Sequence, residues 1–460
     1  MLDQNIIDEL KSIVGERHVL TSPEDLVAYS YDATFTSARP NLVVLPDSTQ
    51  EVSEVLKVAN RELIPVVPRG MGTGLAAGSI PFGGGIVLPL TRMDRLLEFD
   101  HDNMMATAEA GIITSELSDA VAREGYFYPP DPTSDYYSTL GGNVACDAGG
   151  AHCLKYGITG HYVMALEVVL ADGRVMRVGG KATKNVTGYD LVRLLVGSEG
   201  TLAVITEVTV RFIAAPETER TAQAIFPQLT DAGRAINAVL ASGVNPSMVE
   251  IMDETAIKSV EEYLNIGLPL DVEAILLIQT DGNEADAVRG IETAAEICRQ
   301  NGAREVRVAA TPEESEEMWK ARSSISGSLG RIRPNKLGED VTVPHSAVPE
   351  MIARIKEISI KWGLPIVIFG HAGDGNLHPN ILFDKRDPEE MERVEEVVGD
   401  LFRAAVEVGG SLSGEHGVGV LKRPYLEMAM GPLAVEMQKR IKRAWDPNNI
   451  LNPGKIFPPA

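Results

Sequence analysis

A glycine-rich segment in the first fifth of the chain constrains the fold more than any other feature. Arg69-Gly70-Met71-Gly72-Thr73-Gly74 directly follows the strand-like run at residues 63–68. Glycines let backbone N–H groups approach an anion closely and form a concave nest, which suits a pyrophosphate. Taken alone, the segment is compatible both with a tight structural turn and with a phosphate cradle.

The two commonest nucleotide-binding motifs do not account for this segment. Gly72 to Ala77 matches the letters GxGxxA, but a Rossmann turn must open a helix. Here Pro81 and the glycines at 83–85 interrupt any helix, and a second strand-like run follows. A Walker loop is excluded as well, because no Gly-Lys-Ser or Gly-Lys-Thr follows the glycines.

Length, charge and cysteine content narrow the class of protein. A chain of 460 residues is expected to form two or more domains. Its net charge of −23 argues against a nucleic-acid partner, which needs clustered basic residues. The three cysteines form no CxxC pair, so no iron–sulfur cluster is predicted. We expect no transmembrane segment and a cytoplasmic location, with membrane association only through partners.

The pattern of apolar residues changes near residue 216. Before it, the sequence predicts a helix at 49–61 with Thr49 as N-cap, and a hairpin at 164–179. The segment 131–160 has too little periodicity for regular structure and is expected to be a long functional loop. After residue 216, strands alternate with amphipathic helices, which predicts an α+β domain with helices on one face of its sheet.

Histidines and carboxylates concentrate in two short glycine-rich segments. His371 and His378 lie between two strand-like runs, and Glu415 and His416 follow in a second segment. A loop joining adjacent strands would bring the two imidazoles together as ligands for Zn²⁺ or Fe²⁺. A histidine taken singly is more often a hydrogen-bonded structural residue than a metal ligand, and the concentration of three of the eight histidines in these two segments is what favours ligands. Asp374 is open to two interpretations, a further ligand or a residue that supports the turn.

In combination, these segments resemble a known family. The glycine-rich segment, Asp131-Pro132-Thr133, residues 139–143, Lys155-Tyr156-Gly157 and residues 197–202 resemble FAD-linked oxidases of the vanillyl-alcohol oxidase type. The resemblance implies an α+β fold with a two-subdomain FAD-binding domain of the PCMH type and a ferredoxin-like α+β substrate cap. It places the FAD-binding domain at 1–215, the cap at 216–410, and a C-terminal segment that returns to the FAD domain at 411–460.

The resemblance also implies which residues contact FAD. Family members with covalent flavin often carry a histidine in the first loop, and residues 69–79 contain none, so we expect non-covalent FAD. The expected FAD-binding residues are Arg69, Gly70, Gly72, Thr73, Gly74, Ser79, Pro132, Thr133, Thr139, Gly142, Asn143, Gly149, Gly157, Ile205 and Asn452.

The histidine segments narrow the resemblance to one branch, the D-lactate, glycolate and D-2-hydroxyglutarate dehydrogenases. It implies that His371, His378 and Glu415 bind a divalent metal, Zn or Fe, and that His416 is the catalytic base. It further implies that the substrate is held by Arg322, Lys336 and Asn380. Removing a hydroxyl proton needs a base with a pKa near the working pH, which suits histidine.

The predicted function is therefore FAD-dependent oxidation of D-lactate or glycolate to the 2-oxo acid, by hydride transfer to flavin. Since the chain has no redox relay of its own, electrons must pass to an external acceptor. Candidates are an electron-transferring flavoprotein, an iron–sulfur subunit, a cytochrome or quinone. The main alternative is a transferase similar to alkylglycerone-phosphate synthase, although the C-terminal residues 457–460 are not a peroxisomal address. A flavin-free metal hydrolase is a further alternative.

Overall fold

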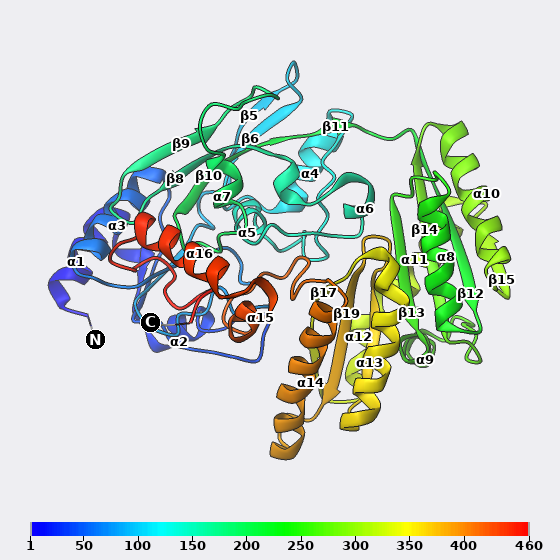
Figure 1. Ribbon diagram of the computed structural model, residues 1–460. Coiled ribbons are helices and arrows are strands. Elements are labelled where there is room, and N and C mark those ends of the chain that lie inside the picture. Colours follow the sequence, from blue (N-terminus) through cyan, green and yellow to red (C-terminus); the bar gives the residue numbers. More distant parts are fainter. Residues whose placement is uncertain (1, 459–460) are drawn as a thin grey trace. The chain divides into compact units, whose positions relative to one another are not determined.

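A computed structural model describes residues 2–458 of the chain, which divides into two compact units. The first unit contains the chain up to Gly149, Ile158–Ala215, and the segment from Glu415 onward. The second contains Gly150–Gly157 and Pro216–Gly414. In Figure 1 the first unit runs from blue through cyan to the blue-green of β8, β9 and β10 and includes the red C-terminal segment, and the second is mainly green, yellow and orange.

Two sheets of different character form the first unit. The smaller sheet has the strand order β1 (Val19–Leu20), β2 (Leu42–Val44), β4 (Ile86–Pro89), β3 (Val66–Arg69), and β4 lies parallel to both β2 and β3. The larger sheet is antiparallel and has the order β5 (Leu96–Asp100), β6 (Met105–Glu109), β10 (Val204–Arg211), β8 (Val163–Val169), β9 (Val175–Gly179). A short pair joins β7 (Tyr126–Phe127) to β11 (Ile213–Ala214).

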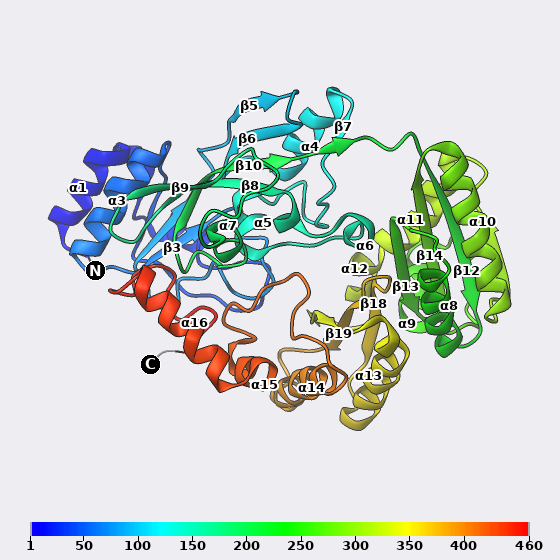
Figure 2. The ribbon, with the colours of Figure 1, turned by 45° about the horizontal axis from the view of Figure 1, so that its top comes forward.

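Eight of the described α-helices belong to the first unit. Figure 2 shows two of them, α1 and α3, side by side. The eight are α1 (Gln4–Val14), α2 (Pro23–Ala28), α3 (Thr49–Arg61), α4 (Thr114–Arg123), α5 (Leu140–Cys146), α7 (Leu191–Leu195), α15 (Leu426–Met430) and α16 (Pro432–Trp445). Helix α3 has the predicted bounds, but its N-cap is Ser48, whose Oγ accepts the N–H of Glu51 at 3.2 Å.

The segment 131–160 is more regular than the sequence predicts, because it contains α5. Two glycines lower the helix propensity of Leu140–Cys146. The helix forms because Thr139 caps it through the N–H of Gly142, and because Asn143 Nδ2 donates to Thr114 Oγ1 at 2.6 Å. Tertiary contacts therefore override local propensity here.

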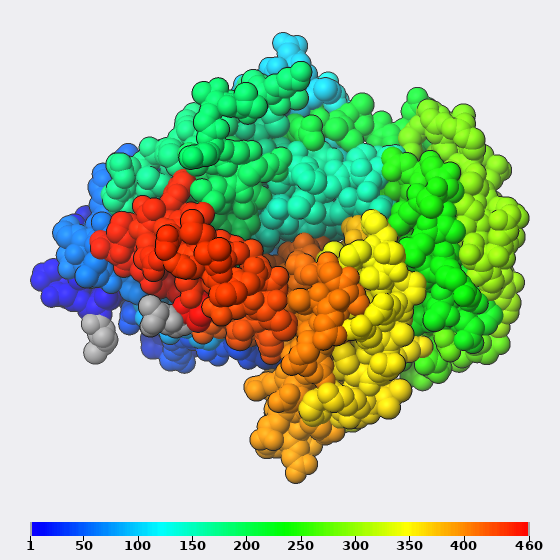
Figure 3. Space-filling model, in the orientation of Figure 1, coloured from blue at the N-terminus to red at the C-terminus, as the bar shows by residue number. Residues whose placement is uncertain are grey.

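The C-terminal segment adds to the small sheet of the first unit. Its helix α16 lies on the surface, red in Figure 3. The N–H of Val66 donates to Ile450 O, and the N–H of Asn452 donates to Val66 O, each at 2.7 Å. Lys442, only 8% exposed, donates to Asp446 and to the carbonyls of Thr201 and Leu451. These contacts fix residues 442–452 to the first unit.

One large sheet organises the second unit. Its order is β15 (Glu305–Val308), β12 (Thr218–Phe226), β14 (Ala274–Gly282), β13 (Met248–Asp253), β18 (Ile366–His371), β19 (Asn376–Phe383), β16 (Asn335–Gly338), and β17 (Val341–Thr342) also pairs with β19. The strands are antiparallel, and β13, β18 and β19 are buried along their whole length.

Helices cover both faces of this sheet, whereas the sequence predicts helices on one face only. Helices α9 (Glu254–Leu264), α11 (Pro312–Ser323) and α12 (Ile325–Ser328) share a hydrophobic core with one face. The others are α8 (Leu229–Ala241), α10 (Glu284–Gln300), α13 (Val348–Trp362) and α14 (Pro388–Glu407), and the short α6 (Cys153–Tyr156) packs near β13. A strand that is buried along almost its whole length, as β14 is, needs cover on both faces.

Candidate active site

The glycine-rich segment begins at the end of β3 and folds back over Arg69. The Arg69 side chain is buried, and its Nη1 donates to Ser79 Oγ at 3.1 Å. Gly72 has a φ of +75°, and a Cβ there would collide with the Arg69 guanidinium. A Cβ on Gly70 would collide with Thr139 Oγ1, so the segment also touches the start of α5. Gly72 is thus required by close packing against the buried Arg69 guanidinium, and Gly70 by close packing against Thr139.

This geometry fits the diphosphate of FAD. A Cβ added to Gly74 would meet no atom within 4 Å, so the backbone there is open to a ligand. An approachable glycine backbone next to a buried guanidinium is a suitable donor set for a phosphate group. Burial lowers the pKa of Arg69 from its usual value, and Asp32 and Tyr29 counteract this.

The other predicted FAD residues fall into three groups. Thr139, Gly142 and Asn143 lie at α5, with Pro132 and Thr133 in the segment before it and Gly149 after it. Ile205 is buried in β10, and Asn452 Nδ2 donates to Gly78 O at 3.0 Å, next to the glycine-rich segment. Gly157 belongs to the second unit, and Thr73 lies half-buried in the glycine-rich segment itself.

The histidine pair lies on a hairpin of the second unit. Strands β18 and β19 are adjacent and antiparallel, with Phe369 opposite His378. His371 and His378 therefore lie on one face of the sheet, and their ring centroids are 5.2 Å apart. Both side chains are buried. Gly375 in the connecting turn has a φ of +81°, and a Cβ there would collide with Val343 O.

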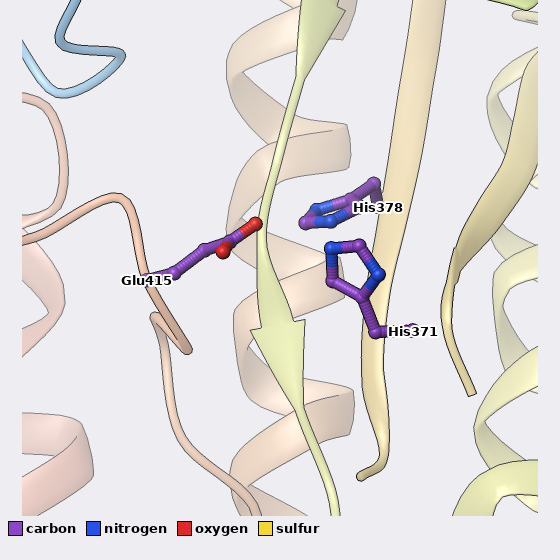
Figure 4. A group of neighbouring side chains, drawn as sticks. All are labelled: His371, His378 and Glu415. Carbon is purple, nitrogen blue, oxygen red and sulfur yellow. The ribbon is translucent and has the colours of Figure 1, made fainter. Parts of the chain in front are cut away.

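Glu415 completes a group of three possible metal ligands. One ligand atom from each of His371, His378 and Glu415 lies within 4.8 Å of the others (Figure 4). Glu415 directly follows Gly414, whose N–H donates to Asp340 Oδ2 at 2.9 Å. Two imidazoles and one carboxylate can hold Zn²⁺ or Fe²⁺ and leave positions for a substrate. The half-buried His416 is the next residue.

A buried carboxylate, Glu250, connects this group to Arg322. Glu250 Oε1 lies 2.5 Å from His371 Nδ1, and Oε2 accepts from Arg322 Nε at 2.7 Å. Burial alone would raise the pKa of Glu250, but its contacts with His371 and Arg322 outweigh burial and hold the pKa at about 2. Arg322 is thereby brought next to His371.

The remaining predicted substrate residues lie on strands near the hairpin. Asn380 is buried on β19, and its Nδ2 donates to His378 O at 2.8 Å. Lys336 lies on β16, where its Nζ donates to Ser326 Oγ, and burial lowers its pKa. Asp374 Oδ1 accepts the N–H of Asn376 at 3.3 Å in an Asx-type turn and is outside the group of three.

Several charged residues of these sites belong to none of the motifs that the sequence shows. Glu250 and Asp340 contact the histidine segments, and Glu199 and Lys455 lie near the glycine-rich segment. The sequence offers one sign of such residues, which is a charged residue inside an apolar run, as in Met248–Asp253. A buried charge needs a partner, so this pattern indicates that a partner exists. It does not identify the partner, because the two residues are far apart in the sequence.

Comparisons with known proteins agree with this architecture. Residues 215–456 match the family model for FAD linked oxidases, C-terminal domain, and residues 40–179 match the one for FAD binding domain. The chain is 42% identical to glycolate oxidase subunit GlcD of Bacillus subtilis, over 99% of this chain and 97% of that protein. It is 35% identical to D-lactate dehydrogenase of Anaerostipes hadrus, over 98% and 97% of the two chains.

Solved structures confirm the predicted fold class. The chain matches p-cresol methylhydroxylase with a TM-score of 0.80 at 18% identity, over 99% of this chain and 96% of the other. It matches alkyldihydroxyacetonephosphate synthase with a TM-score of 0.76 at 19% identity, over 98% and 86%. Identities this low show the fold alone. The full-length relatives and the family models show more: the chain belongs to the FAD-linked oxidases and is an FAD-binding oxidoreductase.

Proposed function

We propose that this protein oxidises a small 2-hydroxy acid, D-lactate or glycolate, to the 2-oxo acid. One observation carries the proposal: two buried imidazoles and a carboxylate converge in an FAD-linked oxidase, beside an arginine held by Glu250. This combination offers a metal site, a carboxylate-binding group and the adjacent His416. Relatives named glycolate oxidase subunit and D-lactate dehydrogenase support the same substrate class.

Two groups outside the chain complete the chemistry. FAD, when bound, accepts the hydride from the substrate α-carbon. A divalent cation, when bound to His371, His378 and Glu415, lowers the pKa of the substrate hydroxyl and orients the substrate. The donor set fits Zn²⁺ or Fe²⁺, and the glycine-rich segment fits the FAD diphosphate, as argued above.

The side chains of the chain hold the substrate and take up its proton. Arg322 binds the substrate carboxylate with the N–H groups that Glu250 leaves unused, and Lys336 adds a positive charge. Asn380 contributes a polar contact from β19. His416 accepts the hydroxyl proton as the hydride leaves.

The electrons must then leave the protein. The three cysteines are Cys146, Cys153 and Cys298, and they form no CxxC motif. We therefore propose an external acceptor: an electron-transferring flavoprotein, an iron–sulfur subunit or quinone. Relatives that are named subunits favour a partner protein. Among the described helices, none is both long and apolar enough to pass through a bilayer.

Removing the metal is expected to abolish flavin reduction while the flavin stays bound. The test is an anaerobic titration of the purified protein with D-lactate, L-lactate and glycolate, before and after chelator treatment. Bleaching of the flavin absorbance by D-lactate or glycolate, lost with chelator and restored by Zn²⁺ or Fe²⁺, is the expected result. Flavin that no 2-hydroxy acid bleaches would contradict the proposal and favour the transferase alternative.

The flavin is expected to be non-covalent, because residues 69–79 contain no histidine. Acid precipitation of the purified protein should therefore release all of the yellow colour into the supernatant. The measurement is the ratio of flavin absorbance in the supernatant to that in the redissolved pellet. Flavin that remains in the pellet would show a covalent link and overturn this part of the proposal.

A further inference from the structure

Glu250 is a buried charge in the middle of an apolar strand. It lies in β13, only 2% exposed, between Val249 and Ile251, and it pairs in register with His371 of β18. Burying a carboxylate is costly unless it is paired and hydrogen-bonded. The contacts of Glu250 must therefore offset the cost of burying its charge.

The two oxygens of the Glu250 carboxylate contact two different side chains. Oε1 faces His371 Nδ1 at 2.5 Å. Oε2 lies 2.7 Å from both Nε and Nη2 of Arg322. The Arg322 guanidinium also lies over the Phe369 ring, 4.8 Å from its centroid, which restrains its position. One side chain thus holds a histidine of the metal group and the arginine beside it.

The contact with His371 selects the nitrogen that is available to a metal. A carboxylate next to Nδ1 keeps the proton of the neutral ring on Nδ1 and leaves the lone pair on Nε2. It also raises the basicity of the ring as a ligand. His371 is therefore oriented to bind a cation through Nε2.

The contact with Arg322 has a parallel effect. A guanidinium has five N–H groups; Glu250 Oε2 accepts the one on Nε and lies 2.7 Å from Nη2. N–H groups that face away from Glu250 remain for an anion, on a guanidinium that Glu250 and Phe369 both restrain. Without Glu250, a largely buried arginine charge would lose its partner and change position.

We propose that Glu250 is a positioning residue that couples the two halves of the active site. It holds His371 for the metal and Arg322 for the substrate carboxylate, without touching either ligand itself. This inference rests on the proposed function and adds to it a residue that links metal affinity to substrate affinity.

Glu250→Gln tests the coupling because an amide has only one acceptor oxygen. If that oxygen faces His371, the amide N–H groups oppose the donors of Arg322, and the reverse arrangement disturbs His371. Loss of such a second partner typically weakens metal binding by about 10- to 100-fold. At saturating metal, we expect KM for the 2-hydroxy acid to rise roughly 10-fold or more, with a smaller change in kcat.

Asp253→Asn is the matched control. Asp253 lies on the same strand, is equally buried, and accepts the N–H groups of Ala256 and Ile368 at 2.8 and 3.0 Å. Its replacement also converts a buried carboxylate to an amide, but next to backbone groups. We expect it to lower stability while Zn²⁺ affinity and KM stay within about threefold of wild type.

Arg322→Gln separates the two contacts and does not depend on the folding of the Glu250 variant. It removes the substrate contact but leaves Glu250 beside His371. KM should rise as in Glu250→Gln, whereas Zn²⁺ affinity should stay near that of wild type. Equal losses of Zn²⁺ affinity in Arg322→Gln and Asp253→Asn would show general disruption and overturn the coupling.

The measurements are Zn²⁺ dissociation constants of chelator-treated protein, by competition with a chromophoric chelator, and KM and kcat from steady-state turnover with an artificial electron acceptor that reoxidises the flavin. The expected result is that Glu250→Gln, and neither of the other two variants, combines weaker Zn²⁺ binding with a higher KM. Wild-type values in Glu250→Gln would overturn this inference and leave the proposed function intact. Wild-type protein that binds no Zn²⁺ or Fe²⁺ and reduces no flavin would instead refute the proposed function.

Discussion

Replacing His416 with glutamine is expected to slow flavin reduction by a 2-hydroxy acid roughly 10²- to 10⁴-fold, the usual contribution of a general base. The reason is that the hydroxyl proton must leave as the α-carbon gives up its hydride, and Gln cannot accept it. The half-buried side chain follows Glu415 directly, so it is close in sequence to the proposed metal ligand. Stopped-flow absorbance of the flavin under anaerobic conditions measures the rate.

The comparison with His101→Gln distinguishes catalysis from general damage. His101 is an exposed histidine of the first unit that packs against Phe99, far along the chain from either histidine segment. Its replacement should leave flavin reduction unchanged. The His416 variant should retain wild-type flavin content and Zn²⁺ affinity. Reduction at the wild-type rate in a fully loaded His416→Gln protein would remove this residue from the mechanism.

Parts of the fold that depend on neighbouring residues were predictable from sequence. Helix α3 and the hairpin of β8 and β9 follow from apolar periodicity and from the turn at Asp172-Gly173, where Gly173 has a φ of +83°. Helix α5 was not predictable, because its glycines disfavour a helix and a contact from Asn143 to Thr114, 29 residues away, stabilises it.

The candidate site likewise contains residues that the local sequence indicates and residues that it does not. His371 and His378 lie seven positions apart on one hairpin, so the sequence alone indicates that they meet. Glu250 lies 121 positions from His371, and no local pattern connects the two. Its signal was an acid between apolar residues of a strand, which predicts that the acid has a partner but does not identify that partner. Only the pairing of β13 with β18 identifies that partner.

Glu199 provides the second large expected effect. It is buried, with a left-handed φ of +52°, and its two oxygens accept the N–H groups of Val418 and Gly419 at 2.7 and 2.8 Å. Burial raises its pKa, which these two hydrogen bonds and the charge of Lys455 counteract. Glu199 therefore holds the segment that begins two residues after His416.

Glu199→Ala is expected to lower the free energy of unfolding by roughly 3–5 kcal/mol, because two backbone N–H groups lose their acceptor and the buried Lys455 loses a nearby carboxylate. Flavin reduction should slow as well, since His416 loses its support. Urea unfolding followed by circular dichroism measures the stability change.

Glu207→Ala is the matched control: its side chain is 22% exposed and faces Arg177, so its loss should cost less than about 1 kcal/mol. Equal losses in the two variants would mean that Glu199 does not act through Val418 and Gly419.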